Sequence, residues 1–117
     1  MDLNVVLEER DGWAVVRVHG DVDVASAPRL REHLVRAVSD GHHHVILDLD
    51  DVHFIDSTGL GVVIGMLKRT RSLGGDLRLV STREMLARVF DITGLDKALP
   101  IDPSVASALA AAGPVGR

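Results

Sequence analysis

Residues Val45 to Gly65 read VILDLDDVHFIDSTGLGVVIG, and this stretch decides the fold. Its first half is a nearly continuous aliphatic run, which is typical of a strand covered on both faces of a sheet. From residue 60 onward the apolar side chains recur at helical spacing, as expected for a helix packed back on that sheet: Leu60, Val63, Ile64 and Leu67. We therefore predict that a strand passes within a few residues into a helix.

Ser57 stands at the start of this predicted helix. A small hydroxyl side chain there can cap free backbone N–H groups, which is one interpretation of the residue. The same position also tolerates an anion, because several N–H donors and the positive end of the helix dipole converge on it. A phosphate on Ser57 is therefore compatible with an intact fold.

The segment FIDSTGLGV, from Phe54 to Val62, resembles the phosphorylation segment of bacterial anti-sigma factor antagonists, which are single STAS domains. The resemblance implies that Ser57, directly after Asp56, is the phosphoacceptor. Thr58 stands where relatives often carry a second serine or threonine, and the sequence leaves its modification open. The resemblance covers almost the whole chain, so we expect a STAS domain over residues 1–112 and a disordered tail over 113–117.

Composition narrows the function classes. The 117 residues suffice for one core, and the absence of cysteine excludes disulfide scaffolds and thiolate zinc sites and agrees with a reducing cytoplasm. The formal charge is −4 and the basic residues are scattered, so no dense patch favours nucleic acid. We find no signal peptide and no apolar run of membrane-spanning length. We expect a cytoplasmic protein with a protein or small-molecule partner, no cofactor, no metal, and no contact with nucleic acid or membrane.

The first third of the chain predicts a hairpin and a helix. Strands at Val5–Glu9 and Trp13–His19 flank an Asp-Gly turn, which is a strong hairpin signal. Ser26 can cap the following helix, Pro28 suits its first turn, and the helix is expected to run to about Asp40. Three consecutive histidines, 42–44, point in different directions and lack a second ligand group, so we interpret them as a solvated loop.

The second half of the chain alternates strand and helix. The remaining predicted elements are a strand at 77–80, a helix opened by the capping box 81–84 and closed by Gly94, an edge strand at 97–101, and a helix at 105–112. In the helix after the capping box we expect Met85, Leu86, Val89 and Phe90 to face the core, and Glu84 to pair with Arg88. The fold class is α/β: a mixed four- to five-stranded sheet opening with a β-hairpin and packed with about four helices, the arrangement of a STAS domain.

Two enzyme-like alternatives fit less well. A serine hydrolase needs G-x-S-x-G with a later histidine, but Ile55 occupies the first glycine position and every histidine precedes Ser57. A receiver domain would use the acids Asp48, Asp50, Asp51 and Asp56 to bind magnesium and accept phosphate, but it does not begin with a hairpin. Gly61 and Gly65 do not complete a nucleotide-binding motif and are expected to let the helix lie close to a neighbouring element.

Ser57 has no base, metal or nucleophilic partner in the sequence, so it suits a substrate better than a catalyst. The resemblance implies that the unmodified domain binds an anti-sigma factor that is a serine kinase and so frees the sigma factor. It also implies that phosphorylation breaks this complex and that a PP2C-type phosphatase restores it. The domain is then a switch and not an enzyme. The alternative within the fold is a ligand-binding or sensor-complex STAS module.

Residues of the partner surface follow partly from the resemblance. Gly20-Asp21-Val22-Asp23 and Ser26-Ala27-Pro28 resemble family segments that approach the phosphorylation site, although Asp23 and Ser26 can also simply cap the first helix. Val62, Met66 and Arg69 form a stripe away from the expected core, either exposed to a partner or covered by another element. The candidate partner-binding set is Asp21, Asp23, Ser26, Asp56, Thr58, Gly59, Val62 and Met66.

Overall fold

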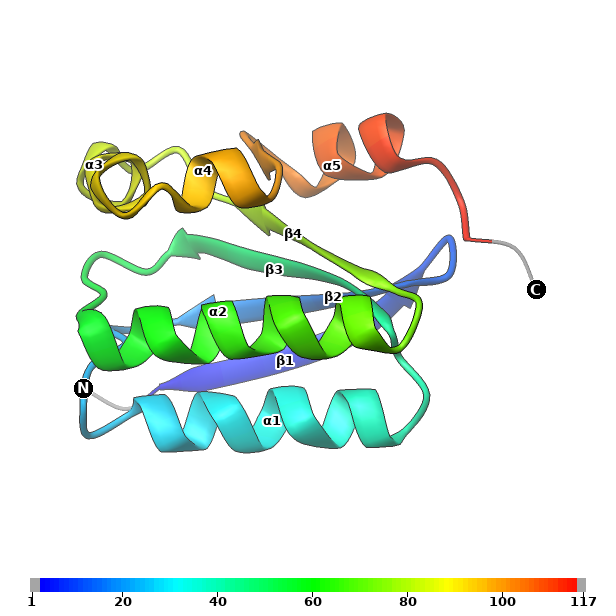
Figure 1. Cartoon of the computed structure of the whole chain (residues 1–117), viewed down its shortest axis with the longest axis horizontal. Coiled ribbons are helices and arrows are strands. Elements are labelled where there is room, and N and C mark those ends of the chain that lie inside the picture. The colour runs from blue at the N-terminus through cyan, green and yellow to red at the C-terminus, as the bar shows by residue number, and fades with distance from the viewer. Residues whose placement is uncertain (1–2, 116–117) are drawn as a thin grey trace.

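The computed structural model describes residues 3–115 and contains a five-stranded sheet in the order β1-β2-β3-β4-β5 (Figure 1). β1 and β2 are antiparallel, and every later pair is parallel. The mixed sheet and opening hairpin confirm the predicted fold class. The strands are β1 (Asn4–Arg10), β2 (Trp13–His19), β3 (His44–Asp51), β4 (Asp76–Val80) and β5 (Ile101–Asp102).

Helices cover the two faces of the sheet unequally. α1 and α2 lie side by side on one face, and α5 packs on the other (Figure 1). Side chains alternate between the two faces: Val16 and Leu47 belong to the large core under α1 and α2, whereas Val15 and Ile46 belong to a smaller core under α5. The helices are α1 (Ala27–Ser39), α2 (Ser57–Ser72), α3 (Glu84–Thr93), α4 (Leu95–Ala98) and α5 (Val105–Ala112).

The segment after Gly94 differs from its prediction. An edge strand was expected over 97–101, but a short helix, α4, comes first and β5 has only two residues. Gly94 adopts a left-handed backbone (φ 76°) that ends α3 and begins α4. Leu95 opens α4 and Leu99 directly follows it, and both side chains are buried in the core.

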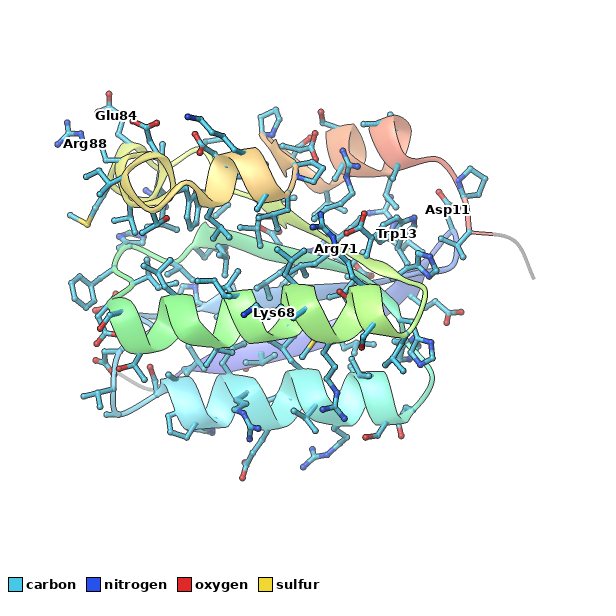
Figure 2. All side chains as sticks on the ribbon, in the orientation of Figure 1. Asp11, Trp13, Lys68, Arg71, Glu84 and Arg88 are labelled. Atoms are coloured by element: carbon cyan, nitrogen blue, oxygen red, sulfur yellow. The ribbon has the colours of Figure 1, made fainter. Side chains whose placement is uncertain are left out.

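The start of α3 also corrects a prediction. The helix begins at Glu84, and the hydroxyl of Ser81 accepts a hydrogen bond from the Arg83 N–H (3.1 Å), so the expected capping box does not form. Glu84 and Arg88 make no ion pair within residues 3–115 (Figure 2). Met85 is 55% exposed, so its expected place in the core was wrong.

The turn between β1 and β2 contacts both the histidine segment and the chain after α5. His44 is the first residue of β3 and packs edge-on against Trp13, with ring centroids 5.3 Å apart, so the solvated-loop interpretation was wrong for it. The Trp13 indole N–H donates to the Gly113 carbonyl (3.0 Å), and the Val115 N–H donates to the Asp11 carbonyl (2.8 Å). Residues 116 and 117 of the expected tail lie outside the described residues.

Candidate functional site

Two loops meet beside Ser57. The β2–α1 loop and the β3–α2 loop form a parallel bridge between Val22 and Ile55. The Val22 N–H donates to the Phe54 carbonyl (2.9 Å), and the Asp56 N–H donates to the Val22 carbonyl (3.1 Å). This pairing places the acidic β2–α1 loop next to the start of α2, as the family resemblance implied.

Asp56, and not Ser57, caps α2. Asp56 Oδ1 accepts the backbone N–H groups of Thr58 (2.9 Å) and Gly59 (3.0 Å), while its Oδ2 accepts the N–H of Val24 (3.0 Å) across the loops. The interpretation of Ser57 as the cap was therefore wrong. Two N–H donors at this helix end are already satisfied, so a phosphate on Ser57 would extend outward beside a carboxylate.

Ser57 is the first residue of α2 and is exposed. Its side chain makes no hydrogen bond to any residue in the described range 3–115. A general base within hydrogen-bonding reach is needed to turn a serine hydroxyl into a nucleophile. Within residues 3–115 no side chain is therefore placed to activate the Ser57 hydroxyl as a nucleophile.

The β2–α1 loop is held rigid by short polar contacts. The Ser26 hydroxyl accepts the Asp23 N–H (3.0 Å) and donates to the Asp21 carbonyl (2.8 Å). Asp23 Oδ1 accepts the N–H groups of Ser26 and Ala25, and the Ser26 N–H contributes most to a pKa of Asp23 below its ordinary value. Ser26 makes no side-chain cap to α1, so that prediction was wrong, while the Asp21 side chain remains exposed.

Gly59 lets the helix start pack against both loops. A Cβ at this buried position would lie 2.7 Å from side-chain carbons of Val22 and Ile55. Such a separation is shorter than any ordinary carbon contact, so only glycine fits without movement. The close packing at Gly59 thus fixes the first turn of α2, which carries Ser57, against the two loops.

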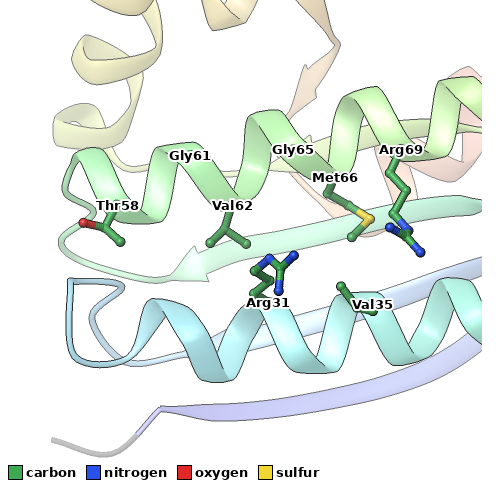
Figure 3. A pocket seen from close by; sticks show the side chains of 8 residues that line it. All are labelled: Arg31, Val35, Thr58, Gly61, Val62, Gly65, Met66 and Arg69. Atoms are coloured by element: carbon green, nitrogen blue, oxygen red, sulfur yellow. The ribbon is translucent and has the colours of Figure 1, made fainter.

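The stripe on α2 faces α1 (Figure 3). Met66 is only 4% exposed because it packs between the two helices, and Val62 is half-buried. Of the two alternatives that the sequence left open, the structure therefore shows Met66 covered by another element. Gly61 and Gly65 face open space, since a Cβ on either would meet nothing within 4 Å, so the expected close approach to another element of the chain is wrong.

Two exposed apolar residues beside Ser57 were missed by the sequence analysis. Val24 is 70% exposed and Phe54 is 44% exposed, and the loops that carry them are joined at the bridge beside Asp56. An aliphatic residue between two loop acids and an aromatic residue just before the phosphorylation motif were the available signals. Large apolar side chains in exposed loops are typical of contact sites for other proteins.

The acids at the end of β3 serve separate structural contacts. Asp50 Oδ1 accepts both the hydroxyl and the N–H of Thr82 (2.7 Å each), and these bonds hold the pKa of Asp50 below its usual value. Partial burial raises the pKa of Asp48, whose carboxylate lies 3.7 Å from Arg17. Within residues 3–115 no three acidic or histidine side chains are arranged to hold a metal ion.

Comparison with known proteins places this geometry in a family. The STAS domain model matches residues 4–108. The anti-sigma-B factor antagonist of Bacillus subtilis is 43% identical over 101 residues, covering 86% of this chain and 92% of that protein. Its counterpart from Staphylococcus epidermidis is 39% identical over 95 residues, covering 81% and 88%. The crystal structure of an anti-sigma factor antagonist from Mycobacterium paratuberculosis superposes with a TM-score of 0.87 at 30% identity, covering 94% and 93%.

Proposed function

Because the chain belongs to the STAS domain family, among the anti-sigma factor antagonists, we propose that its unphosphorylated form binds an anti-sigma serine kinase and so frees a sigma factor. Phosphorylation of Ser57 by that kinase ends the complex, and a PP2C-type phosphatase restores the binding form. The protein acts as a cytoplasmic regulator without catalytic activity of its own. No helix within residues 3–115 is long and apolar enough to cross a membrane.

The observation that carries this proposal is the exposed hydroxyl of Ser57, which lies beside the Asp56 carboxylate and makes no hydrogen bond to any of the residues 3–115. A phosphate adds about −1.5 to −2 charges and a large hydration shell. Here it would stand next to a carboxylate whose two oxygens already accept three backbone N–H groups, and neither loop carries a lysine or arginine to neutralise it. The modification therefore leaves the fold intact while it disfavours a closely packed protein contact at this position.

The docking surface that we propose consists of the exposed residues around that hydroxyl, and we call it the switch surface: Asp21, Val24, Phe54, Ser57 and Thr58. Val24 and Phe54 supply its apolar area, and Asp21 supplies charge that steers a basic partner. Asp23, Ser26, Asp56 and Gly59 support this surface by fixing the loops beneath it.

Phosphorylation and binding can be measured together. We would incubate the protein with a candidate anti-sigma kinase, ATP and magnesium, map the phosphosite, and compare the affinity of Ser57→Ala and Ser57→Asp for the kinase, with Thr58→Ala as the matched neighbour. We expect acid-stable phosphate on Ser57, retained binding of the alanine variant and loss of binding by the aspartate variant. Acid-labile phosphate on an aspartate, or no phosphorylation by any such kinase, would contradict the proposal and favour a receiver-like or ligand-binding STAS module.

A further inference from the structure

A groove of about 300 Å³ lies between α1 and α2 (Figure 3). Thr58 lies at one end, one residue beyond Ser57, and Arg69 lies three helical turns away at the other. Val62 and Met66 line the groove with apolar surface. The groove therefore continues the switch surface along the helix that Ser57 begins.

The outer side of α2 is left bare along this groove. Gly61 and Gly65 both line it, and a Cβ on either would meet no other atom within 4 Å. Glycine is unfavourable inside a helix compared with alanine. Packing among residues 3–115 does not require glycine at either position, because a side chain there would meet no other atom. Two glycines four residues apart leave the helix backbone open to close approach by a second molecule.

Positive charge marks the same groove. Arg31 projects from α1 and Arg69 from α2, and neither guanidinium makes an ion pair or side-chain hydrogen bond with the residues at 3–115 (Figure 3). α2 carries Lys68, Arg69 and Arg71 and no acidic residue, although the whole chain has a formal charge of −4. Unpaired guanidinium groups beside an apolar floor are suited to carboxylates on an otherwise apolar segment.

We infer that the α1–α2 groove binds an acidic segment of the anti-sigma kinase that docks on the switch surface. The segment lays small or apolar side chains over Gly61 and Gly65 and directs carboxylates to Arg31 and Arg69. Two features favour this occupant. Thr58 belongs to both the switch surface and the groove, and the arginines of the groove complement an acidic segment. The inference rests on the proposed function, since it assigns a second contact to the same partner.

The test uses the kinase that phosphorylates Ser57 and measures its affinity for the whole unphosphorylated protein by calorimetry. Arg31→Glu and Arg69→Glu each place a carboxylate where the segment presents one, and we expect each to weaken binding about tenfold or more. Gly65→Gln fills the groove without changing charge, and we expect a similar loss. Arg88→Glu is the control, because Arg88 is exposed on α3 outside the groove and makes the same change in net charge.

The possible results distinguish failure of the groove inference from failure of the proposed function. Urea unfolding first establishes that each variant is folded. If Ser57→Asp abolishes binding while all three groove variants bind like the wild type, the groove inference is wrong and the proposed function stands. If no anti-sigma kinase binds or modifies the wild type, both fail. If sedimentation shows a dimer of the wild type that Gly65→Gln dissociates, with kinase affinity unchanged, the groove belongs to a second copy and the inference is overturned.

Discussion

Asp56 joins the two loops and the helix of the site through one carboxylate. One oxygen caps α2 and the other accepts the N–H of Val24 in the β2–α1 loop, so both oxygens of the carboxylate next to Ser57 are engaged. The sequence located Ser57 at the helix start but assigned the cap to the wrong residue. Aspartate and serine are nearly equal as caps, and the choice depends on where the backbone leaves the extended region, which here is Asp56 (φ −103°, ψ −174°).

Glycines in α2 give a matched test of packing. Gly59→Ala would force a methyl group to 2.7 Å from carbons of Val22 and Ile55, so we expect the free energy of unfolding to fall by about 1–3 kcal/mol. Gly61→Ala adds the same methyl group to open space, and we expect it to raise stability by up to about 1 kcal/mol. Urea titration of both variants measures the difference, and equal stabilities would show that the contact at Gly59 relaxes freely.

Asp48 and Asp50 should respond to pH in opposite directions. Hydrogen bonds from Thr82 lower the pKa of Asp50 in the folded protein. The ionised side chain therefore stabilises the fold at any pH above the pKa of an unfolded aspartate, about 4. This contribution is lost as the pH falls through the lowered pKa of the folded state. The pKa of Asp48 is raised by burial, so its ionised form costs stability once pH rises through that raised value.

Asparagine variants test these signs. At neutral pH we expect Asp50→Asn to be less stable than the wild type and Asp48→Asn to be at least as stable, with both differences shrinking at a pH well below about 4. Urea unfolding at the two pH values is the measurement. A loss of stability in Asp48→Asn at neutral pH that exceeds the loss in Asp50→Asn would show that the contact of Asp48 with Arg17 outweighs its burial.

At the scale of elements, strong local patterns were predictable and short, packing-dependent pieces were not. The Asp-Gly turn and the alternation in β2 predicted the hairpin, and α5 begins and ends at the predicted residues. α4 was missed because four residues have almost no helical preference alone, and its existence depends on the burial of Leu95 and Leu99. The burial of Met66 could likewise not be predicted from the sequence, since it depends on how closely α1 lies to α2.

The end of the domain is a further prediction at this scale. Deleting residues 113–117 removes the carbonyl that accepts the Trp13 indole N–H and the bond from Val115 to Asp11. We expect the free energy of unfolding to fall by about 1–3 kcal/mol. The emission of Trp13, the only tryptophan, should shift to longer wavelength as its indole N–H becomes hydrated. Unchanged stability and emission would support the domain boundary at residue 112 and a tail without a structural role.

Across the whole molecule, acidic and basic side chains lie on two different surfaces. Acidic loops, with Asp21 exposed, surround the proposed phosphorylation position, whereas the groove between α1 and α2 carries arginines that make no ion pair within residues 3–115. A partner that spans both surfaces needs complementary charges on two regions, which fixes its orientation. The sequence predicted neither this separation nor the groove, because both depend on how two helices distant in sequence lie side by side.

In the proposed mechanism, phosphorylation of one hydroxyl, that of Ser57, switches a protein contact. The most direct measurement is the dissociation constant of the same kinase for the unmodified protein and for the protein phosphorylated on Ser57. Enclosing a hydrated phosphate beside the Asp56 carboxylate in a packed contact incurs both desolvation and like-charge repulsion. Each 1.4 kcal/mol is tenfold in affinity, so we predict binding at least about 100-fold weaker after phosphorylation. Affinities that agree within about twofold would contradict the account, because an exposed phosphate beside Asp56 would then leave the contact unchanged.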